Sequence, residues 1–291
     1  MEIRKIGKTR WGQDGAIFGG LLFRFDQSGL CLVYDVEKLE AGEGNTEELK
    51  PEAQFYLDKA DKIVPHGNAV VFGNEFYEEG DEFPLLYSNI YNNYAEADDP
   101  LVGVCCVYRL TRIKGGFSST LVQIIHIGFT DSTEYWRSGG GVSDVRPYGN
   151  FVVDTENSKY YAFVMRDADK TTRYFEFELP KSRDGVIDER FGVKKVTLDV
   201  CDVKSFFDVP YHNYVQGACM YEGSIYSLEG FDEEIHPVLR VIDTEQKKEV
   251  FFFDFFEAGL PIEAELIDFY RGKCYYSDYR GNTFLLEGFS D

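Results

Sequence analysis

Three strand-like segments follow one another between residues 148 and 180, and units like this one recur along the chain. Residues 151–154 form a short apolar run, residues 160–166 are aromatic and apolar, and residues 171–179 alternate between aromatic and charged side chains. That alternation is the period-2 pattern of a half-buried strand. Because β-branched and aromatic residues dominate and turns recur within a few residues, the pattern favours strands over helices.

This unit starts with the polar residue Asn150, which leads into a run of small or apolar residues. Four similar starts are found elsewhere in the chain. They begin at Asp14 (DGAIFGG), His66 (HGNAVVFG), Gln216 (QGACMYEG) and Glu263 (EAELIDFYRG). Each start leads into further strand candidates, and the excess length lies in polar loops. This arrangement predicts an all-β chain in which four-stranded sheets repeat radially, a five-bladed β-propeller.

Small residues at the innermost strands suit sheets that converge on an axis, whereas a β-sandwich would not explain them. The fifth unit has room for only three strands before the sequence stops. If residues 2–6 supply the missing outer strand, the ring closes without a covalent bond and two sheet edges disappear. Six blades stay open as the alternative, since the residues between Gly67 and Gly149 are numerous enough to hold another blade. We expect residues 1–291 to form a single domain.

The net charge of −21 argues against nucleic acid or an anionic membrane surface as a partner, because both require clustered Lys and Arg. The six cysteines show no CxxC spacing, and most lie in apolar strand-like runs, which predicts reduced, packed thiols. No apolar stretch of about 18 residues and no signal-peptide pattern is present. We therefore expect a cytoplasmic protein.

Residues that enter the inner strands of a propeller surround one mouth of its central channel. Here the expected ring is rich in polar side chains, which makes it the default small-molecule site. Its members are Gln13, Asp14, His66, Asn68, Asp144, Arg146, Asn150, His212, Asn213, Gln216, Glu263 and Glu265. Aromatic walls are expected from Trp11, Tyr148, Tyr211 and Tyr214. In the alternative interpretation, these polar groups cap strands and satisfy buried backbone groups between blades.

Anion binding and metal binding are two further possibilities at this ring. Arg146 could bind a carboxylate or phosphate through its planar guanidinium, or form a salt bridge with a neighbouring acidic residue. His66 and His212 lack any HxH or HxxxH spacing, so we predict no metal site, and no motif indicates a cofactor.

The strand rhythm over the whole chain resembles that of the five-bladed arabinanase-type and levansucrase-type glycoside hydrolases and of five-bladed sugar-binding lectins. In these hydrolases, carboxylates on the inner strands of separate blades act as base or nucleophile, as acid, and as a group that tunes the acid. The resemblance implies Asp14 as one carboxylate and Glu263 or Glu265 as another. The sequence departs from the hydrolase pattern in its second unit, with His66 and Asn68, and in its fourth, with His212 and Gln216.

Our functional hypothesis is a propeller that binds a small polar ligand, a carbohydrate or sugar derivative, at the channel mouth. Glycoside-processing activity stays open beside binding; it would use Asp14 with Glu263 or Glu265 as the acid–base pair, assisted by His66 or His212. The competing hypothesis is a non-catalytic scaffold that recognises a protein partner through its rim or a blade face. A sizeable exposed aromatic patch away from the channel would favour the scaffold.

Overall fold

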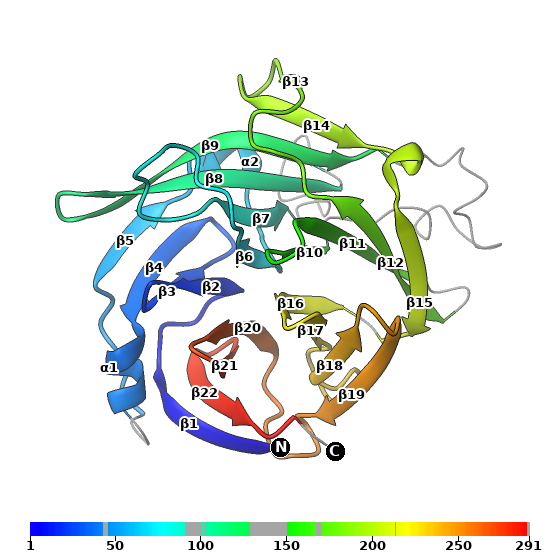
Figure 1. Ribbon diagram of the computed structural model, residues 1–291. Helices are drawn as coiled ribbons and strands as arrows, with labels where there is room; N and C mark the ends of the chain where they lie inside the picture. The colour runs from blue at the N-terminus through cyan, green and yellow to red at the C-terminus, as the bar shows by residue number, and fades with distance from the viewer. Residues whose placement is uncertain are drawn as a thin grey trace.

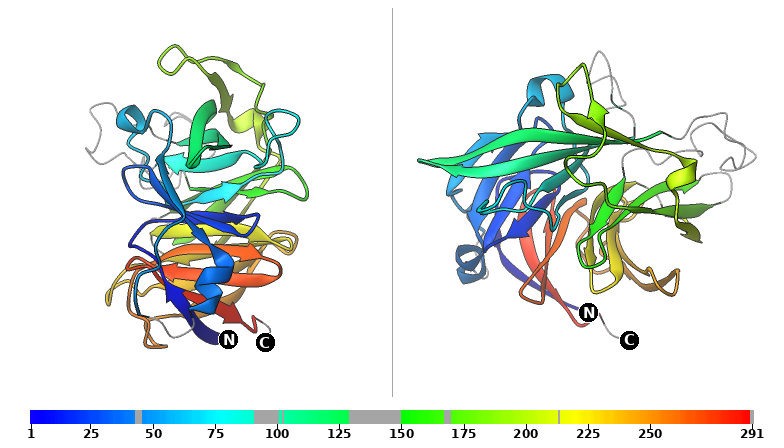
Figure 2. Two further views of the ribbon diagram at one scale, coloured as in Figure 1. Left: turned by 90° about the vertical axis from the view of Figure 1, so that its left-hand side faces the viewer. Right: turned by 45° about the horizontal axis from the view of Figure 1, so that its top comes forward.

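The computed structural model describes residues 1–42, 46–90, 101, 103–128, 150–166, 170–212 and 214–289. These residues form five sheets around a central axis, which confirms the predicted five-bladed β-propeller (Figure 1). Figure 2 shows the same ring from its side and tilted forward. Within the described residues there are five sheets, not the six of the alternative arrangement.

Each blade is built on a four-stranded antiparallel sheet. Blade 1 comprises β2 (Gly15–Phe18), β3 (Leu21–Phe25), β4 (Leu30–Asp35) and β5 (Ala53–Tyr56). The main part of blade 2 comprises β6 (Val70–Phe72), β7 (Leu86–Ile90), β8 (Val104–Ile113) and β9 (Gly116–Ile127). Blade 3 comprises β10 (Phe151–Asp154), β11 (Lys159–Arg166), β12 (Thr171–Glu178) and β15 (Ser205–Pro210).

Blades 4 and 5 complete the ring. Blade 4 comprises β16 (Val215–Tyr221), β17 (Ser224–Glu229), β18 (Val238–Asp243) and β19 (Lys248–Asp254). Blade 5 comprises β20 (Ala264–Tyr270), β21 (Lys273–Asp278), β22 (Asn282–Glu287) and β1 (Glu2–Lys8). The helical segments are α1 (Val36–Ala41), α2 (Ala60–Ile63) and the 3-10 turn η3 (Val200–Asp202).

All five predicted starts lead into the innermost strand of a blade. These strands are β2, β6, β10, β16 and β20, and each contacts its neighbours around the axis (Figure 1). All five inner strands run from one face of the ring to the opposite face. Residues just before the five strands therefore meet at one mouth of the channel, and residues at their ends meet at the opposite mouth.

The amino-terminal strand closes the ring, as predicted. β1 pairs antiparallel with β22, from Glu2 opposite Glu287 to Lys8 opposite Asn282. The first strand of the chain and the last therefore lie side by side in the outer part of blade 5 (Figures 1 and 2). Ile6 of β1 is fully buried and packs with Leu39 of α1 and Tyr275 of β21, so the closing strand contributes apolar burial as well as ladder hydrogen bonds.

Each blade buries both of its faces against its neighbours. On β12, Phe175 and Phe177 belong to one core cluster, whereas Tyr174 on the opposite face belongs to another. The Tyr174 ring stacks between Phe163, at 4.7 Å, and Phe207, at 5.2 Å. The prediction of a half-buried strand is confirmed for β12, in which four of the eight residues are buried, and the buried residues lie on both faces of the strand.

Blade 2 carries an extension that the sequence did not indicate. The segment between β12 and β15 of blade 3 leaves its own blade and forms β13 (Val186–Ile187) and β14 (Lys194–Leu198). β14 pairs parallel to β9, from Lys194 opposite Gln123 to Leu198 opposite Ile127. This segment therefore ties the outer edge of blade 2 to blade 3.

The six cysteines are free thiols, in line with the prediction. Five of them are buried and Cys201 is exposed.

The crowding expected at the axis is visible at Gly217 of β16. A Cβ atom there would lie 2.2 Å from the carbonyl oxygen of Glu265 on β20, which is backbone and cannot turn aside. By contrast, a Cβ atom at Gly116 of β9 would meet only the Cβ of Ala53, at an ordinary 3.8 Å. Two strands of different blades therefore touch at Gly217 more closely than any side chain would permit.

We expect Gly217→Ala to lower the free energy of unfolding by about 1 to 3 kcal/mol, because blades 4 and 5 must move apart to admit the methyl group. The matched control Gly116→Ala should change it by less than about 0.5 kcal/mol. Urea denaturation followed by tryptophan fluorescence measures both. Equal losses in the two variants would contradict the close approach at the axis.

Candidate functional site

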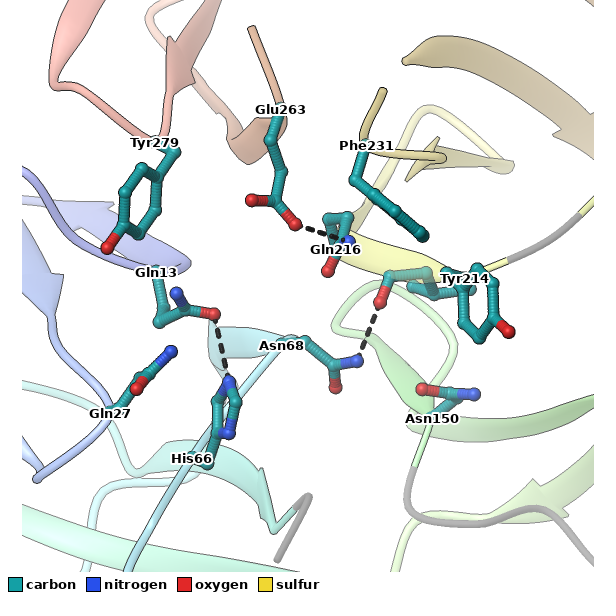
Figure 3. Close-up of a pocket in the computed structure, with 11 residues that line it drawn as sticks. Gln13, Gln27, His66, Asn68, Asn150, Tyr214, Gln216, Phe231, Glu263 and Tyr279 are labelled. Carbon is teal, nitrogen blue, oxygen red and sulfur yellow. Dashed lines mark hydrogen bonds between the residues drawn. The ribbon is translucent and has the colours of Figure 1, made fainter. Parts of the chain in front are cut away.

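A cavity of about 490 Å³ occupies the mouth where the inner strands begin (Figure 3). All five blades contribute to it. The lining consists of the polar residues Gln13, Gln27, His66, Asn68, Asn150, Gln216 and Glu263, the rings of Tyr214, Phe231 and Tyr279, and Val215. Six of the residues predicted for the ring thus come together: Gln13, His66, Asn68, Asn150, Gln216 and Glu263.

Two β-bulges control which polar side chains face the cavity. The register of β16 against β17 shifts between Val215 and Gly217, so Gln216 is the extra residue. The register of β20 against β21 shifts between Ala264 and Leu266, which makes Glu265 the extra residue of blade 5. A bulge re-aims the side chain it carries. Gln216 lines the cavity, whereas Glu265 is fully buried next to the axis.

Hydrogen bonds between blades fix the polar lining. His66 Nε2 lies 3.2 Å from Gln13 Oε1, and since an amide oxygen only accepts, the imidazole donates. Gln216 Nε2 donates to Glu263 Oε1 at 2.7 Å, and the other oxygen of Glu263 points toward the cavity (Figure 3). Each pair joins two adjacent blades. The donors and acceptors around the cavity are therefore held in place before any ligand arrives.

Asn68 is the most constrained of the lining residues. Its Nδ2 donates to the carbonyl oxygen of Val215 at 2.6 Å, which links blade 2 to blade 4. Asn89 of β7 also fixes its position. Asn89 Oδ1 accepts hydrogen bonds from the backbone N–H groups of Asn68 and Ala69, at 2.8 and 2.9 Å. Asn89 Nδ2 donates to Asn68 Oδ1. For Asn68 the structural interpretation, in which a polar side chain satisfies buried backbone groups, therefore fits the contacts.

Glu263 is the only carboxyl group among the described residues that line this cavity. Burial raises the pKa of Glu263, and the negative charge of Asp232 raises it further. On this side the cavity borders a groove that shares Phe231, Glu263 and Tyr279 and contains Asp232, Glu233, Glu234 and Arg280. The rim between blades 4 and 5 is therefore acidic.

Asp14 and Glu265 lie beneath the cavity without lining it. Both are fully buried, and burial raises the pKa of each carboxyl group. Asp14 Oδ2 accepts from the Val70 backbone N–H at 2.8 Å. The buried guanidinium of Arg24 faces the two carboxyl groups and donates through Nη2 to the carbonyl oxygens of Gly12, at 3.0 Å, and Asp278, at 2.7 Å. The catalytic roles expected for Asp14 and Glu265 stay predictions.

The remaining expected residues lie elsewhere. His212 is not in the cavity lining; its Nδ1 lies 3.6 Å from Glu229 Oε2, and Glu229 is in turn bound by Arg240 at 3.0 Å. Asp144, Arg146 and Asn213 lie outside the described residues.

The expected aromatic walls are found in part. Tyr214 lines the cavity and packs against Phe231 at a ring distance of 5.3 Å. Its φ of +58° is a left-handed conformation that bulky residues rarely adopt, and such outliers gather at functional sites. Trp11 packs at 5.9 Å against Tyr279 from outside the lining, and the Tyr211 ring lies 4.8 Å from Lys170 Nζ. Tyr148 lies outside the described residues.

Sequence reasoning missed Gln27, Phe231 and Tyr279. All three lie just after the second strand of a blade, in the turns that follow β3, β17 and β21. In an antiparallel sheet the turn after the second strand returns to the face where the first strand began. The same topological rule that located the strand starts would have identified these turns as the second part of the rim.

Among the residues that the structure describes, no group of three or more His, Cys, Asp or Glu side chains is arranged to hold a metal ion. None of the described helices has the length and apolar character required to cross a bilayer.

Comparison with known proteins gives the fold. The chain is similar to the crystal structure of Myxococcus xanthus glutaminyl cyclase, with a TM-score of 0.50 and 11% identity, over 99% of this chain and 96% of that one. At this identity the likeness concerns the propeller fold alone. Saccharomyces cerevisiae Sqt1 (TM-score 0.36, 7% identity, 92% of this chain and 55% of that one) and the computationally designed Ika8 protein (0.35, 8%, 97% and 99%) are less similar. No family model and no curated protein sequence matches the chain.

The electrostatics at Glu263 give a direct test of the site. Replacing Asp232 with Asn should lower the pKa of Glu263 toward its ordinary value, because one of the two causes of the rise is removed while burial remains. A pH titration of the side-chain carboxyl ¹³C shift, assigned with Glu263→Gln, measures it. The control Glu287→Gln removes a charge from the outer edge of the same blade and should leave the pKa unchanged. A pKa of Glu263 that is the same in Asp232→Asn and wild type would show that the two groups do not interact.

Proposed function

We propose that the cavity at the start of the inner strands binds a small, neutral, polyhydroxylated ligand, a carbohydrate or a sugar derivative. The observation that carries this proposal is the composition of the lining: amide and imidazole groups from several blades beside three aromatic rings in one cavity of about 490 Å³.

The polar groups suit hydroxyls in particular. An amide side chain presents both donors and an acceptor, and so does a neutral imidazole, which matches the donor and acceptor character of each hydroxyl. Gln13, Gln27 and Gln216 offer this combination from blades 1 and 4. Because hydrogen bonds already hold the side chains of Gln13 and Gln216, these two lose little conformational freedom when a ligand binds.

The aromatic rings supply the apolar part of the contact. Tyr214, Phe231 and Tyr279 surround the polar groups, and flat rings of this kind pack against the C–H faces of a sugar while hydroxyls reach outward. The single carboxyl group, Glu263, adds a strong acceptor for a hydroxyl or amine hydrogen. A ligand with its own negative charge is disfavoured by Glu263 and the acidic rim beside it.

Binding is favoured over glycoside hydrolysis by the number of carboxyl groups. Both hydrolytic geometries require two carboxyl groups that flank the scissile bond. Within the described lining Glu263 stands alone, since Asp14 and Glu265 are buried below it. Glycoside processing therefore stays a prediction.

The scaffold hypothesis stays a prediction as well. The most exposed large apolar side chains that the structure describes are Tyr56 on β5, Val186 and Ile187 on β13, Ile113 on β8 and Phe252 on β19. They are divided among blades 1, 2 and 4, and no observation joins them into one recognition surface.

A thermal-shift panel of neutral monosaccharides, sugar acids and polyols tests the proposed function, because a ligand that binds only the native state raises Tm with its concentration. We expect neutral sugars to give a saturable rise and sugar acids to give less. Tyr279→Ala should weaken binding of the best sugar about tenfold, since it removes a ring worth about 1 kcal/mol or more. The control Tyr56→Ala removes an exposed tyrosine of blade 1 and should bind normally. A panel without any saturable shift, or equal affinity in Tyr279→Ala and wild type, would refute the proposal.

A further inference from the structure

A second cavity, of about 260 Å³, lies at the opposite end of the channel, where the inner strands end. Every inner strand contributes to its lining, for example through Phe18 of β2, Val71 of β6, Val153 of β10, Tyr221 of β16 and Asp268 of β20. None of the residues that line the first cavity lines the second.

The chemistry of the second cavity differs sharply from that of the first. Most of its described lining residues have apolar or aromatic side chains, beside polar groups such as Thr155, and the Phe18 and Phe72 rings lie 5.4 Å apart. The rings of Tyr221 and Phe269 stack at 3.9 Å. One carboxyl group, Asp268, interrupts this apolar lining, and no lysine or arginine is among the described residues around it. The cavity therefore combines aromatic walls with a single negative charge.

Asp268 is held in a fixed position. Its Oδ2 accepts from the backbone N–H of Ile17 at 2.6 Å, and its Oδ1 accepts from the backbone N–H of Phe269 at 2.8 Å. Each carboxylate oxygen keeps a further lone pair for a second donor. The carboxyl group is thus oriented by the sheet and still able to accept from a ligand.

Among the residues that the structure describes, no positively charged group contributes to the pKa of Asp268. The titratable groups that face it are Asp14, which directly precedes β2, Cys219 of β16 and Cys274 of β21. Burial raises the pKa of both thiols, so they are neutral, and it raises the pKa of Asp268 to about 7. An ionised carboxyl group in such surroundings is costly unless a cation joins it.

We propose that this cavity binds a small apolar ammonium ion, an alkylamine in its charged form. The ammonium group donates to Asp268 and supplies the missing positive charge. The aromatic rings then contact the alkyl chain and attract the cation through their faces. A neutral molecule of the same shape lacks the charge, and an anion is repelled. This site is independent of the sugar site proposed above, since the two share no residue.

The binding should depend on pH. Alkylamines stay charged well above neutral pH, whereas Asp268 loses its proton near pH 7. Below that pH the ligand must pair with a neutral carboxyl group. The affinity should therefore rise as the pH increases through about 7 and then level off.

NMR titration with isoamylamine, and with isoamyl alcohol as its neutral isostere, tests the proposal on the full chain. Met220 lines the cavity, so its ¹³C-labelled methyl group reports occupancy, and the methyl group of Met1 on the outer edge of blade 5 is the reference. We expect a saturable shift of the Met220 signal with isoamylamine, and binding of the alcohol weaker by about tenfold or more. Asp268→Asn should weaken amine binding by a similar factor, while Asp61→Asn, a matched loss of one charge on α2, should not.

Equal binding of amine and alcohol, unchanged amine affinity in Asp268→Asn, or no saturable shift of Met220 in wild type would each overturn the proposal. If Asp268→Asn does not fold, the amine–alcohol comparison and its pH dependence in the wild-type protein still decide. Tyr279→Ala, which removes no residue of the second cavity, should bind isoamylamine normally, so failure of the sugar proposal leaves this test intact.

Discussion

The close approach of the inner strands to one axis is the constraint on which the rest of the structure depends. At Gly217 the backbone of blade 4 meets the backbone of blade 5 with no room for a methyl group. Strands this close cannot all keep a regular ladder, and both β16 and β20 contain a bulge at this level. The bulges place Gln216 at the cavity and Glu265 beside the axis. Crowding at the centre thus selects small residues and also decides where the polar side chains go.

The pairing of β1 with blade 5 closes the ring and so keeps the crowded inner strands together. Strands pressed together at an axis would separate if the ring could open, but β1 belongs to the start of the chain and pairs with the last strand, β22. The blades also hold one another through both faces: Tyr174 of blade 3 shares a buried cluster with Ile225 and Ile242 of blade 4, and the Phe23 ring of blade 1 packs against the Phe72 ring of blade 2 at 5.4 Å. The high aromatic content therefore serves the contacts between blades, which are the part of the core that a single sheet could not supply.

The starts of the inner strands were predictable because crowding at the axis selects small residues and burial selects apolar residues at neighbouring positions. Both patterns are visible in the sequence. The identity of the site residues was only partly predictable, since it depends on side-chain direction. Gln216 and Glu265 occupy equivalent places, yet only Gln216 lines the cavity. His212 precedes its strand by only a few residues and still lies against Glu229. A bulge or a local turn reverses such directions without any signature in a single sequence. The added strand β14 was hidden for a related reason, since its partner β9 is distant along the chain.

The two ends of the channel are joined by a row of carboxyl groups. Glu263 at the first cavity raises the pKa of Glu265, Asp14 also raises the pKa of Glu265, and Asp268 at the second cavity raises the pKa of Asp14. Arg24 faces the middle of this row and opposes the effect on both buried members. Groups that influence one another in this way do not titrate independently. A positive charge placed at either cavity favours ionisation of its nearest carboxyl group, and that negative charge then disfavours ionisation of the next. The protonation states of the buried Asp14 and Glu265 therefore depend on the carboxyl groups at the two mouths.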